Sequence, residues 1–429
     1  MQKVEKYLEK NTDKIITTFI WIQPIIDVLT AIMLHNNMSF TIGIIIRIAF
    51  LLFMVFYLLI STKNKKKYLI YLSITFIYIL LFMINTITQK GIESIWYELQ
   101  NTFKCFYFPI MFICIYNCYK KSKKNISKML SNLFVIYLLF ILIPNVLNLG
   151  FGSYEITKKG SIGWFYTANE VGAIISILMP FYLSEIINKK NKPIIFLSII
   201  IIFYTLTTMG TKGPLLSFGI ILIYYFIKYY KKIIKEKKYK TLGIMTTSFI
   251  IVILALIMII PKTTFYKNII IHLDFLKVEK ISDFKNPKII DHFIFSQRLT
   301  FLNNTVKIYN KSPISSKLLG IGYIDNYGTD QVSMKMIEMD YFDILFRQGI
   351  IGIVIIFGGI VMMINKKKRT KKINDVYLLS LFLSIILALL TGHVITSPSV
   401  SIYVALIIDL IYNGNIKEIG NDKTRVCNC

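Results

Sequence analysis

Residues 241–261 read TLGIMTTSFIIVILALIMIIP, and directly after them the chain turns polar and stays so as far as residue 340. A run of roughly 20 apolar residues is long enough to cross the ~30 Å hydrocarbon core of a bilayer as a helix. The segment 262–340 is the longest polar stretch of the sequence. We therefore expect a membrane protein with one large loop outside the bilayer.

Similar apolar runs recur along the whole chain of 429 residues, of which 55% are hydrophobic and only 17% charged. Soluble domains carry about 25% charged residues. Because lipid satisfies no backbone polar group, such runs must be helices rather than open strands. The runs lie near 14–34, 40–61, 67–85, 103–119, 130–148, 169–187, 193–210, 213–230, 241–261, 341–365, 374–391 and 396–413.

These runs predict an all-α, polytopic integral membrane protein with about twelve transmembrane helices. About nine helices fall in residues 1–261, before the large loop 262–340, and about three fall in residues 341–413. Residues 414–429 form a short tail after the last run. The first run follows a mixed-charge stretch without a small-residue cleavage site, so we expect it to be an anchor rather than a removed signal peptide.

The formal net charge of +27 is distributed by loop. Lysines cluster at 63–67, 120–128, 189–192, 228–240 and 366–372, whereas short loops such as 35–39 and 392–397 carry almost none. This alternation is typical of the positive-inside rule and predicts two cytoplasmic termini and an extracytoplasmic loop 262–340. It favours contact with the lipid bilayer over nucleic acid, and we expect no nucleic-acid partner.

The sequence contains no soluble catalytic signature: no Walker loop, dinucleotide fingerprint, GxSxG or HExxH motif. Its five cysteines do not suggest a disulfide framework, because Cys105, Cys114 and Cys118 share one apolar run and Cys427 and Cys429 end the chain. Any reaction must therefore draw its energy from an activated substrate already in the membrane.

Two candidate residues open the apolar run at 169. Asn169 suits a helix N-cap, and a functional role is the alternative. Glu170 is either a first-turn partner of the helix dipole or a catalytic acid or base.

Two candidate cations face the side of the large loop. Lys212, in the tight turn TMGTKGP of residues 208–214, suits anion binding or is a lysine that snorkels to the interface. Arg298, before a predicted short helix at 301–309, offers a planar fork of donors for phosphate or pyrophosphate. A solvated surface charge is the alternative for any single loop arginine.

The acidic exit of the loop reads EMDYFDILFRQGIIG from 338 to 352. Asp343 and Arg347, at i and i+4, are expected to pair. Glu338 and Asp340 at a membrane-edge helix start suit a general base, and dipole compensation is the rival explanation.

His393 of the last loop is either a catalyst or hydrogen-bonded filler. Within the membrane, Asp27 and Arg47 suit a buried pair.

The order of these motifs resembles the O-antigen ligase and polymerase superfamily of bacterial envelope proteins. The resemblance rests on Asn-x-x-Gly at 169–172, Thr-Lys-Gly at 211–213, Arg298, Gly-x-Gly at 320–322, and the exit motif ending in Gly-x-x-Gly at 349–352. Aligning that glycine pair places Glu338 where many ligases carry His, followed by Asp340 and Tyr341. The acidic exit and the final GHVITSP (392–398) look more like capsule or exopolysaccharide polymerases of low-GC Gram-positive bacteria.

The resemblance implies a GT-C-like fold in the bacterial cytoplasmic membrane and a metal-independent glycosyl transfer without a cofactor. The implied donor is a growing glycan on undecaprenyl pyrophosphate, and the acceptor is the hydroxyl of a lipid-linked repeat unit. Arg298 and Lys212 are the expected pyrophosphate ligands, with Glu338 or Asp340 as the base. Asn169, Glu170, Tyr341 and His393 are further candidates for substrate binding, and a flippase and a chain-length regulator are candidate partners.

Two rival functions remain open. A ligase would hand finished glycan to a wall or other acceptor from the same donor site. A flippase or transporter of lipid-linked sugars would instead show charged residues along a central path and repeat symmetry.

Overall fold

The computed structural model describes residues 2–38, 41–61, 65–154, 158–324, 335–364 and 373–412. The tail 414–429 with its two cysteines, and the lysine cluster 366–372, lie outside the described residues. The long helices are α1 (Gln2–Trp21), α2 (Gln23–His35), α3 (Ile42–Ser61), α4 (Lys65–Lys90), α5 (Ile95–Cys118), α6 (Lys123–Val146), α7 (Ala168–Asn188), α8 (Lys192–Met209), α9 (Lys212–Lys235), α10 (Tyr239–Ile259), α15 (Asp340–Ile364), α16 (Asp375–Leu390) and α17 (Pro398–Tyr412).

The all-helical, polytopic membrane architecture is confirmed. Each of the twelve apolar runs falls on one of these helices, the first run on the α1–α2 pair. Within the described ranges, seven helices are by themselves long and apolar enough to span a bilayer, or eight if α1 and α2, bent by 45°, form one broken span. The helices α16 and α17 are apolar but shorter. The number twelve therefore stays a prediction.

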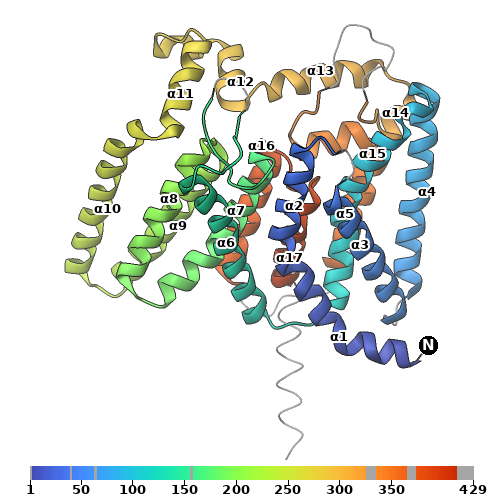
Figure 1. The fold of residues 1–429 in the computed structure, drawn as a ribbon, viewed down its shortest axis with the longest axis horizontal. Helices are drawn as coiled ribbons and strands as arrows, with labels where there is room; N and C mark the ends of the chain where they lie inside the picture. The colour runs from blue at the N-terminus through green and yellow to red at the C-terminus, as the bar shows by residue number, and fades with distance from the viewer. Residues whose placement is uncertain are drawn as a thin grey trace, which may run out of the picture.

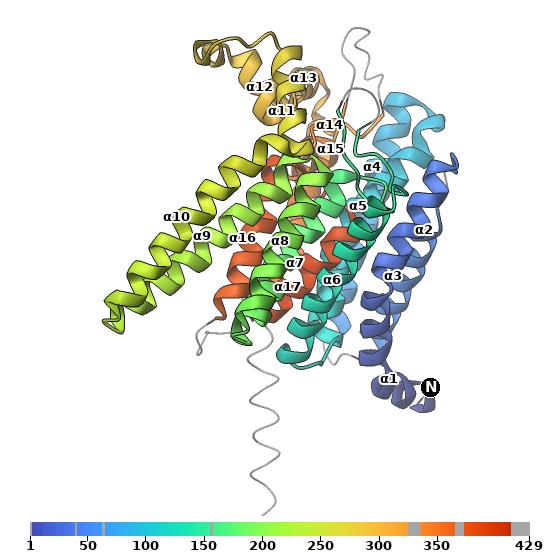
Figure 2. The same cartoon turned by 60° about the vertical axis from the view of Figure 1, so that its left-hand side comes forward.

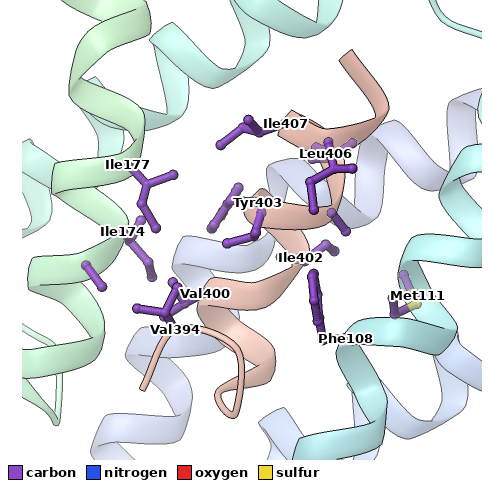
Figure 3. Close-up of a cluster of buried hydrophobic side chains, with 14 of the residues drawn as sticks. Phe108, Met111, Ile174, Ile177, Val394, Val400, Ile402, Tyr403, Leu406 and Ile407 are labelled. Carbon is purple, nitrogen blue, oxygen red and sulfur yellow. The ribbon is translucent and has the colours of Figure 1, made fainter. Parts of the chain in front are cut away.

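Helix α17 is the centre of the bundle (Figure 1). Its residues from Ser399 to Ile411 are all buried, and a helix that is apolar on every side is stable only when other helices surround it. Figure 3 shows Ile402, Tyr403 and Leu406 of α17 among side chains from α5 and α7, including Phe108 and Ile174. This core fixes the ends of the neighbouring helices relative to one another.

The large loop is itself helical. It contains α11 (Thr264–Phe275), α12 (Pro287–Phe295), α13 (Arg298–Lys311) and α14 (Ile314–Leu319), with the 3-10 turns η2 (Ile260–Lys262) and η3 (Ile281–Lys285); a further turn, η1 (Ile92–Ser94), precedes α5. The short helix expected at 301–309 is thus confirmed as the longer α13. Figures 1 and 2 show these helices over one end of the bundle, here called the loop end, with α13 running from α12 to α14.

The junctions α5–α6, α7–α8 and α9–α10, which carry three of the lysine clusters, lie at the opposite end of the bundle (Figure 1). Three lysine-rich short loops therefore share one end of the bundle, as the positive-inside rule predicts for short loops. The orientation itself, with the loop end outside the cell, stays a prediction.

Helix α15 is broken rather than straight. Gly349 has φ 68° and ψ −177°, which interrupts the helical backbone. Tyr341 and Phe357 would lie about 24 Å apart along a straight helix, yet their ring centroids are 5.9 Å apart in a stacked pair. The two arms of α15, residues 340–348 and 350–364, therefore fold back on each other.

The Gly-x-Gly motif seals this break. The Ile321 and Gly322 amides donate to the carbonyls of Phe346 (3.0 Å) and Arg347 (3.1 Å), and the Tyr78 hydroxyl of α4 donates to the Gln348 carbonyl (2.6 Å). These bonds satisfy carbonyls that the end of a helix leaves without a partner. Gly320 has φ 111°, and a Cβ there would collide with the Arg347 carbonyl. The motif therefore has a packing role.

Gly349→Ala is expected to destabilise the protein by about 2 kcal/mol or more, because a side chain at this φ is strained and its Cβ would meet the backbone of Leu318 and Gly320. Gly358→Ala is the matched control on the same helix, since nothing lies within 4 Å of its added Cβ. Thermal unfolding in nanodiscs, followed by loss of the monodisperse peak, measures both. Equal melting temperatures would show that the break does not need glycine.

Ile281, 90% exposed in the loop, offers a test of orientation. Ile281→Cys, in a background without Cys427 and Cys429, should be labelled by a membrane-impermeant maleimide in intact cells. Asn188→Cys, exposed at the opposite end, should be labelled only after lysis. The reverse pattern would place the large loop in the cytoplasm.

Candidate functional site at the loop end

Arg298 is positioned by a buried carboxylate. Asp291 of α12 accepts the backbone amides of Leu299 and Thr300, both at 2.9 Å, and the Thr300 hydroxyl at 2.6 Å. Ser296 and Gln297 take left-handed φ values of 53° and 67° between the two helices. Asp291 thus caps α13 and fixes Arg298 as its first residue.

Arg298 binds Glu338. Its Nη2 donates to Glu338 Oε2 at 2.8 Å, and its Nε donates to the Glu338 carbonyl at 3.1 Å. Longer contacts of 3.4 Å run to the carbonyls of Phe295 and Thr391. The Arg298 side chain is 9% exposed and that of Glu338 29% exposed. The pair therefore combines a positioned cation with a carboxylate that solvent or a substrate can reach.

Asp340 ties the start of α15 to the last loop. Its Oδ1 accepts the His393 amide and the Thr396 hydroxyl, both at 2.8 Å, and its Oδ2 accepts the amides of Val394 (2.8 Å) and Ile395 (2.6 Å). The residue is 1% exposed. Both oxygens are thus occupied by donors, which suits a structural anchor.

Asp343 and Arg347 close the exit of the large loop. The expected ion pair is present, with 4.0 Å between Arg347 Nε and Asp343 Oδ1, and both side chains are buried. Asp343 also accepts the amides of Ile337 and Met339, while Arg347 donates to the carbonyls of Gly322 and Lys335. The pair therefore holds Gly322 and residues 335–339 of the large loop against the start of α15.

The turn between α8 and α9 brings Lys212 to the same end. Gly210 takes φ 71° and α9 begins at Lys212, as the TMGTKGP sequence predicts. A Cβ on Gly172 of α7 would lie 2.7 Å from Pro214, so the two short motifs pack directly together. Lys212 Nζ donates to the Phe293 carbonyl of α12 and lies 4.1 Å from the centre of the Phe293 ring.

The remaining candidates take different places. The interpretation of Asn169 as an N-cap is wrong, because α7 begins at Ala168 and Thr167 is its cap residue. Glu170 accepts the hydroxyls of Ser397 (2.9 Å) and Ser399 (3.4 Å), which links α7 to the start of α17. His393 contributes its backbone amide to Asp340.

The structure thus brings Arg298, Glu338 and Asp340 into one connected group around 391–396. Lys212 reaches the same helix, α12, at Phe293, whereas Arg298 reaches it at Phe295. Glu170 lies on the other side of the last loop, bound to Ser397. Tyr341 points along α15 to Phe357 instead.

Sequence reasoning missed several residues of this region. Asp291 lies within the apolar helix α12, which reads PKIIDHFIF, and this pattern does not indicate that its side chain caps the next helix, α13. Glu98 of α5 is buried with Lys90, at 3.0 Å, and accepts the amides of Tyr323 and Ile324, which holds the loop against α4 and α5. The sequence offered one indication of the role of Glu98, because it is a charged residue at the edge of an apolar run.

The buried pair of Asp27 and Arg47 is confirmed. Arg47 also donates to Gln23, and the Tyr137 hydroxyl donates to Asp27 at 2.6 Å. The network links α2, α3 and α6 and so satisfies its charges inside the bundle. Among the described residues, no group of three or more His, Cys, Asp or Glu side chains is arranged to hold a metal ion.

Asp340→Asn is expected to lower the free energy of unfolding by about 1–3 kcal/mol, because an amide nitrogen would face amide donors in a buried site. Glu338→Gln should cost less than about 1 kcal/mol, since its side chain is partly exposed. Chemical denaturation of the two purified variants measures the difference. A Glu338 variant less stable than the Asp340 variant would reverse the assignment of the anchor.

The sequence of the whole chain can be compared with known proteins. A family model described as "O-antigen ligase like membrane protein" matches residues 9–289 and 278–416. No curated protein matches the chain. Because the matched residues cover nearly the whole sequence, the chain belongs to the family of O-antigen ligase-like membrane proteins.

Proposed function

We propose that this protein polymerises undecaprenyl-pyrophosphate-linked oligosaccharide repeat units into a surface polysaccharide, on the outer face of the bacterial cytoplasmic membrane. Its family makes it a membrane enzyme of the glycosyl-transfer type, acting in glycan polymerisation or ligation. The observation that carries the proposal is the ion pair of Arg298 and Glu338 at the loop end.

Glu338 is the base in this proposal. Its Oε2 is bound by Arg298, while the carboxylate remains 29% exposed and so open to an incoming hydroxyl. Asp340 is a poorer candidate, because three backbone amides and one hydroxyl already bind its two oxygens and the residue is buried. A base must be within hydrogen-bond reach of the proton that it removes.

Arg298 and Lys212 hold the departing pyrophosphate. Two of the contacts of Arg298, to the carbonyls of Phe295 and Thr391, are 3.4 Å long. These distances are long for hydrogen bonds, so phosphate oxygens can replace the two carbonyls easily. Fixed cations aimed at the charge that develops on a leaving group are the main source of such catalysis. The two cations supply this stabilisation here, without a cofactor.

The reaction balances as a simple transfer. The acceptor hydroxyl gives its proton to Glu338 and forms a new bond to the anomeric carbon of the donor glycan. The bond from that carbon to pyrophosphate breaks, and its electron pair leaves with the lipid pyrophosphate. Both substrates are anchored in the bilayer, which suits a site at the ends of membrane helices, and a separate flippase would deliver them.

A ligase is the nearest alternative. It would use the same donor site and differ only in its acceptor. The carboxylate at 338, where many ligases carry His, favours the polymerase. A flippase is less favoured, because Arg298, Glu338 and Lys212 lie at one end of the bundle, and the charged pair inside it, Asp27 and Arg47, is neutralised by its own contacts.

Arg298→Ala is expected to leave single repeat units on undecaprenyl pyrophosphate, as deletion of the gene should, because the leaving group loses its cation. Lys307→Ala, an exposed residue of the same helix, should give normal chain lengths at equal protein levels. Glycan length on the lipid carrier, resolved by gel and mass spectrometry, measures both. Normal polymer in the Arg298 variant would sink the proposal.

The same assay separates the alternatives. Long lipid-linked chains that never reach the wall in the deletion strain would identify a ligase. Repeat units trapped on the cytoplasmic face would identify a flippase.

A further inference from the structure

A second group of polar residues lies at the loop end, around the ring of Phe293 in α12. The His272 ring of α11 lies 5.6 Å from the Phe293 ring, centre to centre, and the Lys212 ammonium of α9 lies 4.1 Å from it. Helices α9 and α11 thus each bring a nitrogen-bearing side chain to the Phe293 ring of α12. We call this place the Phe293 junction and define it by Lys158, Thr211, Lys212 and His272.

Asn268 of α11 holds the junction together. Its side chain is buried, accepts the Lys159 amide at 2.9 Å, and donates to the carbonyls of Lys159 (2.5 Å) and Gly210 (3.3 Å). A Cβ on Gly210 would lie 2.5 Å from Asn268 Nδ2. These contacts fix the loop that carries Lys158 and the turn that carries Thr211 against α11.

The charges of the junction are all positive. Burial, then Lys158, Lys212 and His292, lower the pKa of His272 to about 4. Burial also lowers the pKa of Lys158. Within the described residues, none of these four side chains forms an ion pair. The nearby acids do not compensate, because Asp291 caps α13 and Asp274, on the far side of α11, is exposed.

Two polar atoms at the junction have no hydrogen-bond partner among the described residues. Thr211 is 8% exposed, and its Oγ1 has no hydrogen-bond partner although it stands at the N-cap of α9. His272 Nδ1 is likewise buried without a partner. Buried polar atoms normally find partners, and the start of a helix attracts anions through its free amides and its dipole.

We propose that the Phe293 junction extends the phosphate site of Lys212 into an oxyanion subsite that includes Thr211, Lys158 and His272, and that His272 takes up a proton when phosphate binds. The inference rests on the proposed function in one respect: the phosphate is taken to belong to the lipid-linked donor. Arg298 and Lys212 bind the Phe295 and Phe293 carbonyls at the same end of α12, so a diphosphate can engage both places. An anionic lipid headgroup offers the same phosphate chemistry.

Proton uptake follows from the electrostatics. His272 is neutral at pH 7, because its burial and the positive charges of Lys158 and Lys212 disfavour a further positive charge and lower its pKa. A bound phosphate reverses the sign of that field and raises the pKa of His272. Phosphate binding should therefore strengthen as the pH falls from 6 to 4, and this part of the pH dependence should disappear in His272→Gln. Burial lowers the pKa of Lys212 to about 8, so protonation of Lys212 acts at higher pH and remains in that variant.

The chain contains only four histidines, which makes the pKa of His272 directly measurable. The full-length protein is labelled at histidine Cε1 with carbon-13, placed in nanodiscs of neutral lipid, and titrated by NMR with and without inorganic pyrophosphate. His272→Gln assigns the resonance. We expect the pKa to rise by at least one unit on addition of pyrophosphate.

Two variants test the residues of the subsite. Thr211→Val and Lys158→Gln should each reduce the rise at least twofold, whereas Lys307→Gln, an exposed control on α13, should leave it unchanged. A rise of equal size in all variants would reflect ionic strength alone and overturn the proposal. No rise in the parent protein, either with pyrophosphate or in phosphatidylglycerol discs, would also overturn it.

The phosphatidylglycerol arm identifies the source of the phosphate. A rise in those discs without pyrophosphate assigns the subsite to a lipid headgroup, and a rise that needs pyrophosphate assigns it to the donor. The test does not depend on catalysis. If the pKa of His272 rises as expected but Arg298→Ala still makes normal polymer, the subsite stands and the proposed function is rejected. If the pKa does not rise but Arg298→Ala leaves single repeat units, the subsite is rejected and the proposed function stands.

Discussion

The geometry of the loop end depends on one carboxylate. Asp340 receives three backbone amides and one hydroxyl from residues 393–396, so the first arm of α15 cannot move without breaking several charge-assisted bonds. Glu338 lies two residues upstream, and its carbonyl would be 2.5 Å from a Cβ on Gly392. Through this contact the last loop positions both Glu338 and the carbonyl of Thr391, which are two of the groups that Arg298 binds.

The break in α15 serves the same arrangement. Irregular backbone near the membrane is tolerated only where other groups satisfy its hydrogen bonds. Here Ile321, Gly322 and Tyr78 supply the missing donors, and the fold-back places the short first arm beneath the loop. Asp343 and Arg347 on that arm then bind the backbone of the loop at Ile337 and at Gly322. The glycines of both short motifs are needed because backbone atoms meet there at contact distance.

Hydropathy and length predicted the helices well, because lipid permits few alternatives for a long apolar run. The order of motifs also placed Arg298 and Glu338 at the same end. Sequence could not show that Gly349 breaks α15, since glycine is tolerated inside membrane helices. Nor could it distinguish the anchor Asp340 from the accessible Glu338, because the two differ only in which loop folds over them. The Phe293 junction joins residues more than a hundred positions apart, such as Lys158 and His272, and no local pattern marks it.

The partners of the two cations bear on how a donor would bind. Lys212 is held by a neutral carbonyl and an aromatic face, which a phosphate can replace at small cost. Arg298 is held partly by Glu338, and pairing with a cation stabilises a charged carboxylate. In the mechanism proposed above, a phosphate that draws the guanidinium away from Glu338 leaves this carboxylate open to the acceptor hydroxyl. Donor binding and activation of the base would then be one event, which explains why the cation and the base should be adjacent rather than at separate ends of the site.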